Sequence, residues 1–146
     1  MSKQNEETPV EILLVEDNPG DVDLTIEALE EGRVANHLSV VEDGAEALAF
    51  LRREEPYQDA PRPDLVLLDL NLPGVDGFEV LTLVKQDEQL KKIPIIVMTT
   101  SDAEHDILKS YNLHANAYVT KPLDVEEFIE VVRALEDFWL TFVRLP

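Results

Sequence analysis

Five short apolar runs alternate along the chain with longer amphipathic segments. The runs are rich in valine, isoleucine and leucine: Ile12–Val15, Leu38–Val41, Leu65–Leu68, Ile95–Met98 and Ala117–Val119. Strands that are buried on both faces of a parallel sheet have this pattern, although a short buried helix can have it too. We therefore interpret the runs as five strands of a parallel sheet.

The segments between the runs carry apolar residues at helical spacing. They are Gly20–Glu31, Ala45–Arg53, the stretch around Phe78–Lys85, the stretch around Ile107–Tyr111, and the residues from Val125 onward. Each such segment predicts a helix with one apolar face. Five strands that alternate with five helices, without a hairpin signal, predict an α/β domain with right-handed crossovers.

The length of 146 residues is that of a single domain. We expect a disordered segment over residues 1–9, the domain over residues 10–139, and a C-terminal tail over residues 140–146. The first residues are polar and resemble no secretory signal, and no apolar run approaches the length of a membrane span. These features predict a cytoplasmic protein without a membrane partner.

The charge of the chain is strongly negative. It carries 31 Asp and Glu residues against 12 Lys and Arg, which gives a formal net charge of -19. A surface of that sign repels phosphate backbones, so the composition argues against nucleic-acid binding. There is no cysteine, which excludes disulfides and thiolate metal sites.

Polar residues that carry chemistry follow four of the five predicted strands. Glu16 and Asp17 follow the first strand, Asp69 the third, Thr99 the fourth and Lys121 the fifth. The carboxyl ends of parallel strands meet at one edge, where ligands bind. Clustered carboxylates need a cation, and oxygen ligands suit Mg²⁺. A carboxylate beside a metal is also a possible nucleophile toward a phosphoryl group. Taken singly, each acid has about even odds of only capping a helix or a turn.

Four motifs around these residues carry a family resemblance. LLVEDN, DLVLLDLNLPGVDG, IIVMTTSD and AYVTKPL together resemble the receiver domains of two-component response regulators. The resemblance implies a flavodoxin-like, doubly wound (βα)5 fold whose five-stranded parallel sheet has the order 2-1-3-4-5. It also implies a helix and tail extended at the C-terminus.

The resemblance assigns roles to the acids. It implies that Asp69 accepts the phosphoryl group as an aspartyl phosphate. It implies that Mg²⁺ is held by Glu16, Asp17, Asp69 and the backbone carbonyl of Asn71. Glu16 stands where an aspartate is commoner in the family, a difference of one methylene.

The resemblance also assigns roles to the residues that would respond to the phosphoryl group. Thr99 and Lys121 would each contact a phosphoryl oxygen, and Thr99 would then act as a switch. Tyr118 occupies the position of the switch aromatic. The bond between Lys121 and Pro122 matches a bond that is cis in the family.

The last helix and the tail predict a contact with another chain. On a helical wheel the apolar arc spans about 200°, wider than the stripe that faces a sheet. The candidate interface residues are Phe128, Val131, Phe138, Trp139 and Phe142. The ending EDFWLTFVRLP is similar to response regulators that serve phytochrome-type histidine kinases, which implies a homodimer. Alternatively, the tail folds back on its own domain.

The sequence is therefore interpreted as a response regulator that consists of a receiver alone. A histidine kinase, for which the phytochrome type is the candidate, would phosphorylate it and so switch a protein-interaction face. It would be a signalling switch with intrinsic phosphorylation and dephosphorylation chemistry, and not a metabolic enzyme. The alternatives are a phosphorelay intermediate, a receiver for another kinase, a scaffold independent of phosphorylation, and a Mg²⁺-dependent phosphatase-like hydrolase. The hydrolase would need an acid where Asn71 stands.

Overall fold

A computed structural model describes residues 9–32, 35–100 and 103–137 of the chain. The strands are β1 (Val10–Val15), β2 (Asn36–Val41), β3 (Leu65–Leu68), β4 (Ile95–Thr99) and β5 (Ala117–Thr120). The helices are α1 (Pro19–Glu30), α2 (Gly44–Arg52), α3 (Gly77–Gln86), α4 (Glu104–Asn112) and α5 (Val125–Glu136). Strand and helix alternate throughout, as the apolar runs predict.

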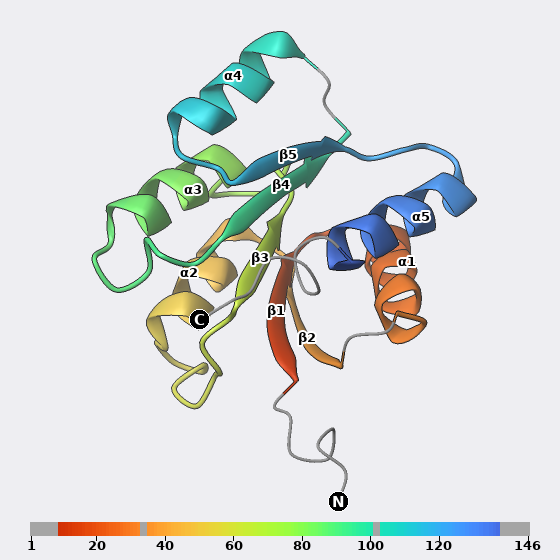
Figure 1. The fold of residues 1–146 in the computed structure, drawn as a ribbon. Helices are drawn as coiled ribbons and strands as arrows, with labels where there is room; N and C mark the ends of the chain where they lie inside the picture. The colour runs from red at the N-terminus through yellow and green to blue at the C-terminus, as the bar shows by residue number, and fades with distance from the viewer. Residues whose placement is uncertain (1–8, 33–34, 101–102, 138–146) are drawn as a thin grey trace, which may run out of the picture.

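The five strands form one parallel sheet in the order β2-β1-β3-β4-β5. Helices α1 and α5 cover one face, whereas α2, α3 and α4 lie on the other (Figure 1). This is the doubly wound, flavodoxin-like fold that the sequence predicts. Because all strands are parallel, their carboxyl ends lie along the same edge of the sheet.

The central strands bury side chains on both faces, which explains why they are apolar throughout. In β1, Leu13 and Val15 pack in the core beneath α2 and α3. Their neighbours Ile12 and Leu14 pack in the core beneath α1 and α5. The sheet thus separates two apolar layers, and residues at the strand ends are held between them.

The position of α5 contradicts the prediction for one interface residue. Phe128 is 2% exposed and packs with Val132 in the core beneath α1 and α5, so it is not available to a partner. A helical wheel gives the width of an apolar arc but not the part of it that covers the sheet. Val131 is half-buried. The other candidates, Phe138, Trp139 and Phe142, lie outside the described residues.

The backbone also contradicts the expected cis bond before Pro122. Among the described residues, the cis peptide bond is Glu55–Pro56, in the loop before β3. The bond between Lys121 and Pro122 is trans. The trans preference of a bond before proline is only about 0.5–1 kcal/mol, so sequence resemblance fixes the isomer weakly.

No helix in the described parts of the chain is both long and apolar enough to cross a membrane. The longest helices, α1 and α5, have 12 residues each. A membrane-spanning helix needs about 20 predominantly apolar residues.

Two leucines test the position of the core. Leu81 of α3 is 0% exposed, whereas Leu123, between β5 and α5, is 95% exposed. We expect Leu81→Ala to lower the free energy of unfolding by about 2–5 kcal/mol, because it leaves a cavity in the core. Leu123→Ala is the matched control, with an expected change below about 0.5 kcal/mol. Urea unfolding measures both, and equal losses would contradict this core.

Candidate functional site

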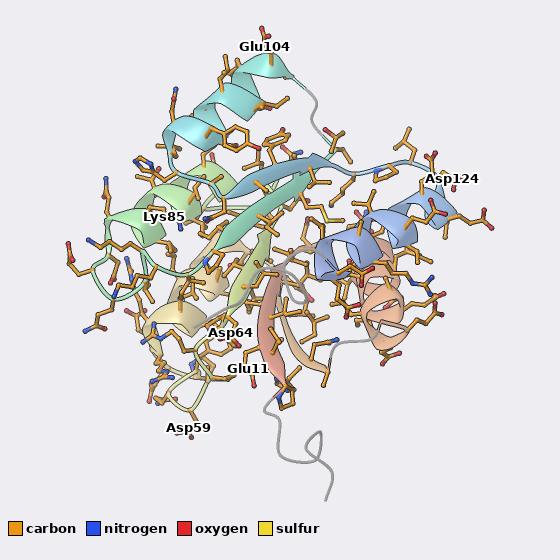
Figure 2. The ribbon with its side chains drawn as sticks, in the orientation of Figure 1. Glu11, Asp59, Asp64, Lys85, Glu104 and Asp124 are labelled. Carbon is orange, nitrogen blue, oxygen red and sulfur yellow. The ribbon has the colours of Figure 1, made fainter. Side chains whose placement is uncertain are left out.

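The predicted site residues meet where β1, β3, β4 and β5 end. Helices α4 and α5 begin at the same edge, near Glu104 and Asp124, whereas Glu11 and Asp64 lie at the opposite edge (Figure 2). The parallel pairing continues past the strand ends and fixes the site backbone. The amide of Glu16 donates to the carbonyl of Val41 at 3.0 Å, and that of Asp69 to the carbonyl of Val15 at 3.1 Å.

The ammonium of Lys121 lies among three carboxylates. Its Nζ donates to Glu16 Oε1, in an ion pair between two buried side chains. It also donates to Asp69 Oδ2 at 3.0 Å and to Asp21 Oδ2 at 2.9 Å. Lys121 is itself held by its backbone amide, which donates to the carbonyl of Thr99 at 2.7 Å. One ammonium therefore uses its three N–H groups on acids from three segments of the chain.

Three of the predicted acids form a group that suits a divalent cation. Carboxylate oxygens of Glu16, Asp17 and Asp69 lie within 4.8 Å of one another, with Glu16 and Asp69 buried and Asp17 exposed. An all-oxygen set of this kind matches the ligands of Mg²⁺, which takes one or two carboxylates and keeps several waters. The exposed Asp17 leaves the group open to solvent. The residues present therefore fit a hydrated divalent cation.

Asn71 links Asp69 to Thr99. Its backbone amide donates to Asp69 Oδ1 at 3.1 Å, and its side-chain Nδ2 donates to Thr99 Oγ1 at 3.3 Å. Thr99 is 0% exposed. Asn71 carries no proton that can be transferred to a leaving group, so this position does not provide the second acid that the phosphatase-like hydrolase would need.

The charges of the site perturb the pKa of two groups. Burial is the largest effect on the Glu16 carboxyl, and it raises the pKa to about 7. The hydrogen bond to Lys121 and the positive charge of Lys121 lower this pKa, whereas the negative charge of Asp69 raises it further. Burial alone would lower the pKa of Lys121. The hydrogen bonds to Glu16 and Asp21 and the charges of Asp69 and Glu16 outweigh burial, so this pKa lies above its ordinary value. Lys121 is thus a permanent cation in a pocket with an excess of acids.

The loop after β3 brings a helix close to Asp69. Gly77 is the first residue of α3, and its amide donates to the carbonyl of Leu70 at 3.1 Å. A Cβ atom at this position would lie 2.5 Å from the carbonyl oxygen of Asp69 and 2.6 Å from Leu70 Cα. Glycine is therefore required for this approach of α3 to the site.

Sequence reasoning missed Asp21. The other acids follow strands directly, whereas Asp21 lies in the first turn of α1 and reaches Lys121 from there. Its position four residues after Asp17 was the available signal, since an acid in the first turn of a helix lies near the preceding strand end. The structure places Tyr118 half-buried in β5, where its amide donates to the hydroxyl of Tyr111 at 3.1 Å.

Comparison with known proteins identifies the family. Residues 12–133 match the model of the response regulator receiver domain, which is most of the chain. The chain therefore belongs to the response regulator receiver family.

Two relatives match almost the whole chain, and one of them is a response regulator. The chain is 46% identical over 138 residues to response regulator Rcp1 of Synechocystis sp., and the match covers 94% of each chain. It is 40% identical over 140 residues to a probable methanogenesis regulatory protein, FilR2, of Methanothrix harundinacea, covering 96% of this chain and 90% of that one.

Two solved structures agree closely with the fold. The Mn²⁺-bound form of Rcp1 has a TM-score of 0.91 at 46% identity, covering 94% of this chain and 99% of that one. The phosphorylated cyanobacterial phytochrome response regulator RcpA has a TM-score of 0.92 at 47% identity, covering 95% and 99%. One similar protein thus holds a divalent cation, and another carries a phosphoryl group.

The acid group predicts stabilisation by a divalent cation. We expect Mg²⁺ to raise the melting temperature of the wild-type protein, because a ligand at 100 times its Kd contributes about 2.7 kcal/mol. Asp17→Asn should weaken the Mg²⁺ affinity at least about tenfold, since it removes the exposed ligand of the group. Asp23→Asn, an exposed acid of α1, is the control of equal charge. Thermal unfolding across a Mg²⁺ titration measures these effects, and equal responses of the two variants would contradict the assignment.

Proposed function

We propose that this response regulator accepts a phosphoryl group on Asp69 from a histidine kinase. The observation that carries the proposal is the position of Asp69, which is 7% exposed, contacts the ammonium of Lys121 and forms the group of three acids with Glu16 and Asp17. A carboxylate oxygen of Asp69 would form the bond to phosphorus as the bond from phosphorus to the kinase histidine breaks. Lys121 lies where it can take up negative charge that develops on the phosphoryl oxygens.

We propose Mg²⁺ as the cation of the acid group, with Glu16, Asp17, Asp69 and the backbone carbonyl of Asn71 as the groups that hold it. When bound, Mg²⁺ would neutralise charge on the transferring phosphoryl group. The contribution of the chain is to keep three carboxylates together in spite of their repulsion. The carboxylate oxygens of the group, within 4.8 Å of one another, support this assignment.

Thr99 and Tyr118 are the proposed switch. Thr99 is buried, and its hydroxyl accepts from Asn71, the neighbour of the acceptor aspartate. A phosphoryl group on Asp69 would offer this hydroxyl a stronger acceptor. Movement of Thr99 would open space for Tyr118, which packs against the core beneath α2 and α3. The face formed by α4 and β5 would then change for a partner.

We propose a phytochrome-type histidine kinase as the source of the phosphoryl group. The similarity to Rcp1 and RcpA supports it, because RcpA is a phytochrome response regulator. FilR2, at 40% identity, is described as a probable regulator of methanogenesis, so a kinase of another type is the alternative. The protein would act as a signalling switch in the cytoplasm, where histidine kinases draw on ATP.

Phosphotransfer from labelled kinases tests both the acceptor and the partner. Each histidine kinase of the source organism is charged from labelled ATP and mixed briefly with wild type, Asp69→Asn and Asp64→Asn. Asp64 lies just before β3, at the other end of the strand from Asp69. We expect rapid transfer from a phytochrome-type kinase to wild type and Asp64→Asn, and none to Asp69→Asn. Transfer only from another kinase would contradict the partner, and label on Asp69→Asn would contradict the acceptor.

We also propose a homodimer built through the last helix and the tail over residues 140–146. The domain itself would span residues 10–139. Three exposed apolar side chains support a contact through α4 and α5: Leu108 and Tyr111 of α4, and Val125 of α5. Val131 remains an interface candidate within the described residues.

Truncation after Asp137 tests the dimer. It removes Phe138, Trp139 and Phe142, and we expect the molar mass in light scattering to fall from that of a dimer to that of a monomer. Replacement of the same three residues by alanine in the full chain separates loss of apolar contact from loss of length. Circular dichroism reports whether each variant keeps the fold, and a folded truncated dimer would count against this interface.

A further inference from the structure

Asp21 holds Lys121 from outside the proposed metal site. Its Oδ2 accepts from Lys121 Nζ at 2.9 Å, a contact as short as that between Lys121 and Asp69. Its side chain is 24% exposed, whereas that of Lys121 is 4% exposed. Asp21 is not among the three acids whose oxygens group together for a cation. It therefore contacts the ammonium but is not one of the predicted ligands of the cation.

The first turn of α1 fixes Asp21 in place. Asn18 caps the helix by accepting from the amide of Asp21 at 3.0 Å, and Pro19 begins the helix. The hydroxyl of Thr25 donates to the backbone carbonyl of Asp21 at 2.8 Å. Proline at this position is pre-organised for a helix start, and an acid in the first turn is favoured by the helix dipole. The carboxylate thus projects from a rigid support.

An ammonium and a divalent cation compete for the same oxygens in this pocket. The ammonium of Lys121 contacts Glu16 and Asp69, two of the three acids that suit the cation. A bound cation needs those lone pairs, so the ammonium must share or release them. Asp21 offers the ammonium a carboxylate outside the group of three acids that would hold the cation. It draws Lys121 toward α1 and adds negative charge near the cation.

We propose that Asp21 is a positioning residue that holds Lys121 so that Glu16 and Asp69 stay available to the divalent cation. This inference rests on the metal site of the proposed function. Without Asp21, the ammonium would share its three N–H groups between the remaining two acids. The cation would then displace a tighter ion pair.

Calorimetric titration of Mg²⁺ into the unphosphorylated protein tests the proposal. We expect Asp21→Asn to weaken binding about three- to tenfold, the scale of one charge interaction across a partly solvated pocket. Asp23→Asn removes an equal charge from the exposed side of the same helix and should change the affinity less than about twofold. Asp21→Glu keeps the charge and should recover most of the affinity. Wild-type affinity in Asp21→Asn would overturn the proposal.

A double-mutant cycle asks whether Asp21 acts through Lys121. In a Lys121→Met background, the factor by which Asp21→Asn weakens Mg²⁺ binding should be at least about three times smaller than in the wild type, because there is no ammonium left to position. An equal effect in both backgrounds would show a direct action on the cation and overturn the positioning role. If Lys121→Met does not fold, the comparison of Asp21→Asn with Asp21→Glu and Asp23→Asn still decides the proposal.

The titrations distinguish failure of the metal site from failure of the positioning role. If the wild-type protein binds no Mg²⁺ at millimolar concentration, both the metal site and the positioning role are wrong. If the wild type binds Mg²⁺ and Asp21→Asn binds it equally well, the positioning role alone is wrong.

Discussion

The ion cluster around Lys121 is the interaction on which the rest of the site depends. A single ammonium, almost entirely buried, contacts carboxylates from the end of β1, the start of α1 and the end of β3. Buried carboxylates repel one another strongly unless a cation lies among them. Pairs of this kind also contribute little net stability, since desolvation offsets most of the attraction. Their arrangement is therefore better explained by the chemistry of the site than by folding.

The parallel sheet makes this cluster possible. Glu16 and Asp69 follow strands whose side chains are buried in two apolar layers, so their backbone has almost no freedom. The pairing between strands continues to Glu16, Asp69 and Lys121, beyond the last residues of their strands. A flexible loop would let the acids separate and reduce their repulsion. Because the strand ends are rigid, the repulsion persists, and it can drive the binding of a cation.

The sequence predicts those parts of the site that follow from strand position. Glu16, Asp17, Asp69, Thr99 and Lys121 each lie at a strand end, and parallel strands must bring their ends together. Asp21 could not be found by that rule, because its approach to Lys121 depends on the direction of α1. Phe128 was wrongly assigned to an interface, since a helical wheel does not show which side of a wide apolar arc faces the sheet. Its burial requires the position of α5 on the sheet, which only the structure gives.

The central claim is that Asp69, and no other carboxylate of the cluster, receives the phosphoryl group. The most direct measurement treats the protein with acetyl phosphate and Mg²⁺, reduces any acyl phosphate with borohydride, and locates the reduced side chain by peptide mapping. The account predicts reduction at Asp69 alone, because this carboxylate contacts Lys121, belongs to the group of three acids and is linked to Thr99 through Asn71. Reduction at Glu16, Asp17 or Asp21 in place of Asp69, or at no residue, would contradict it.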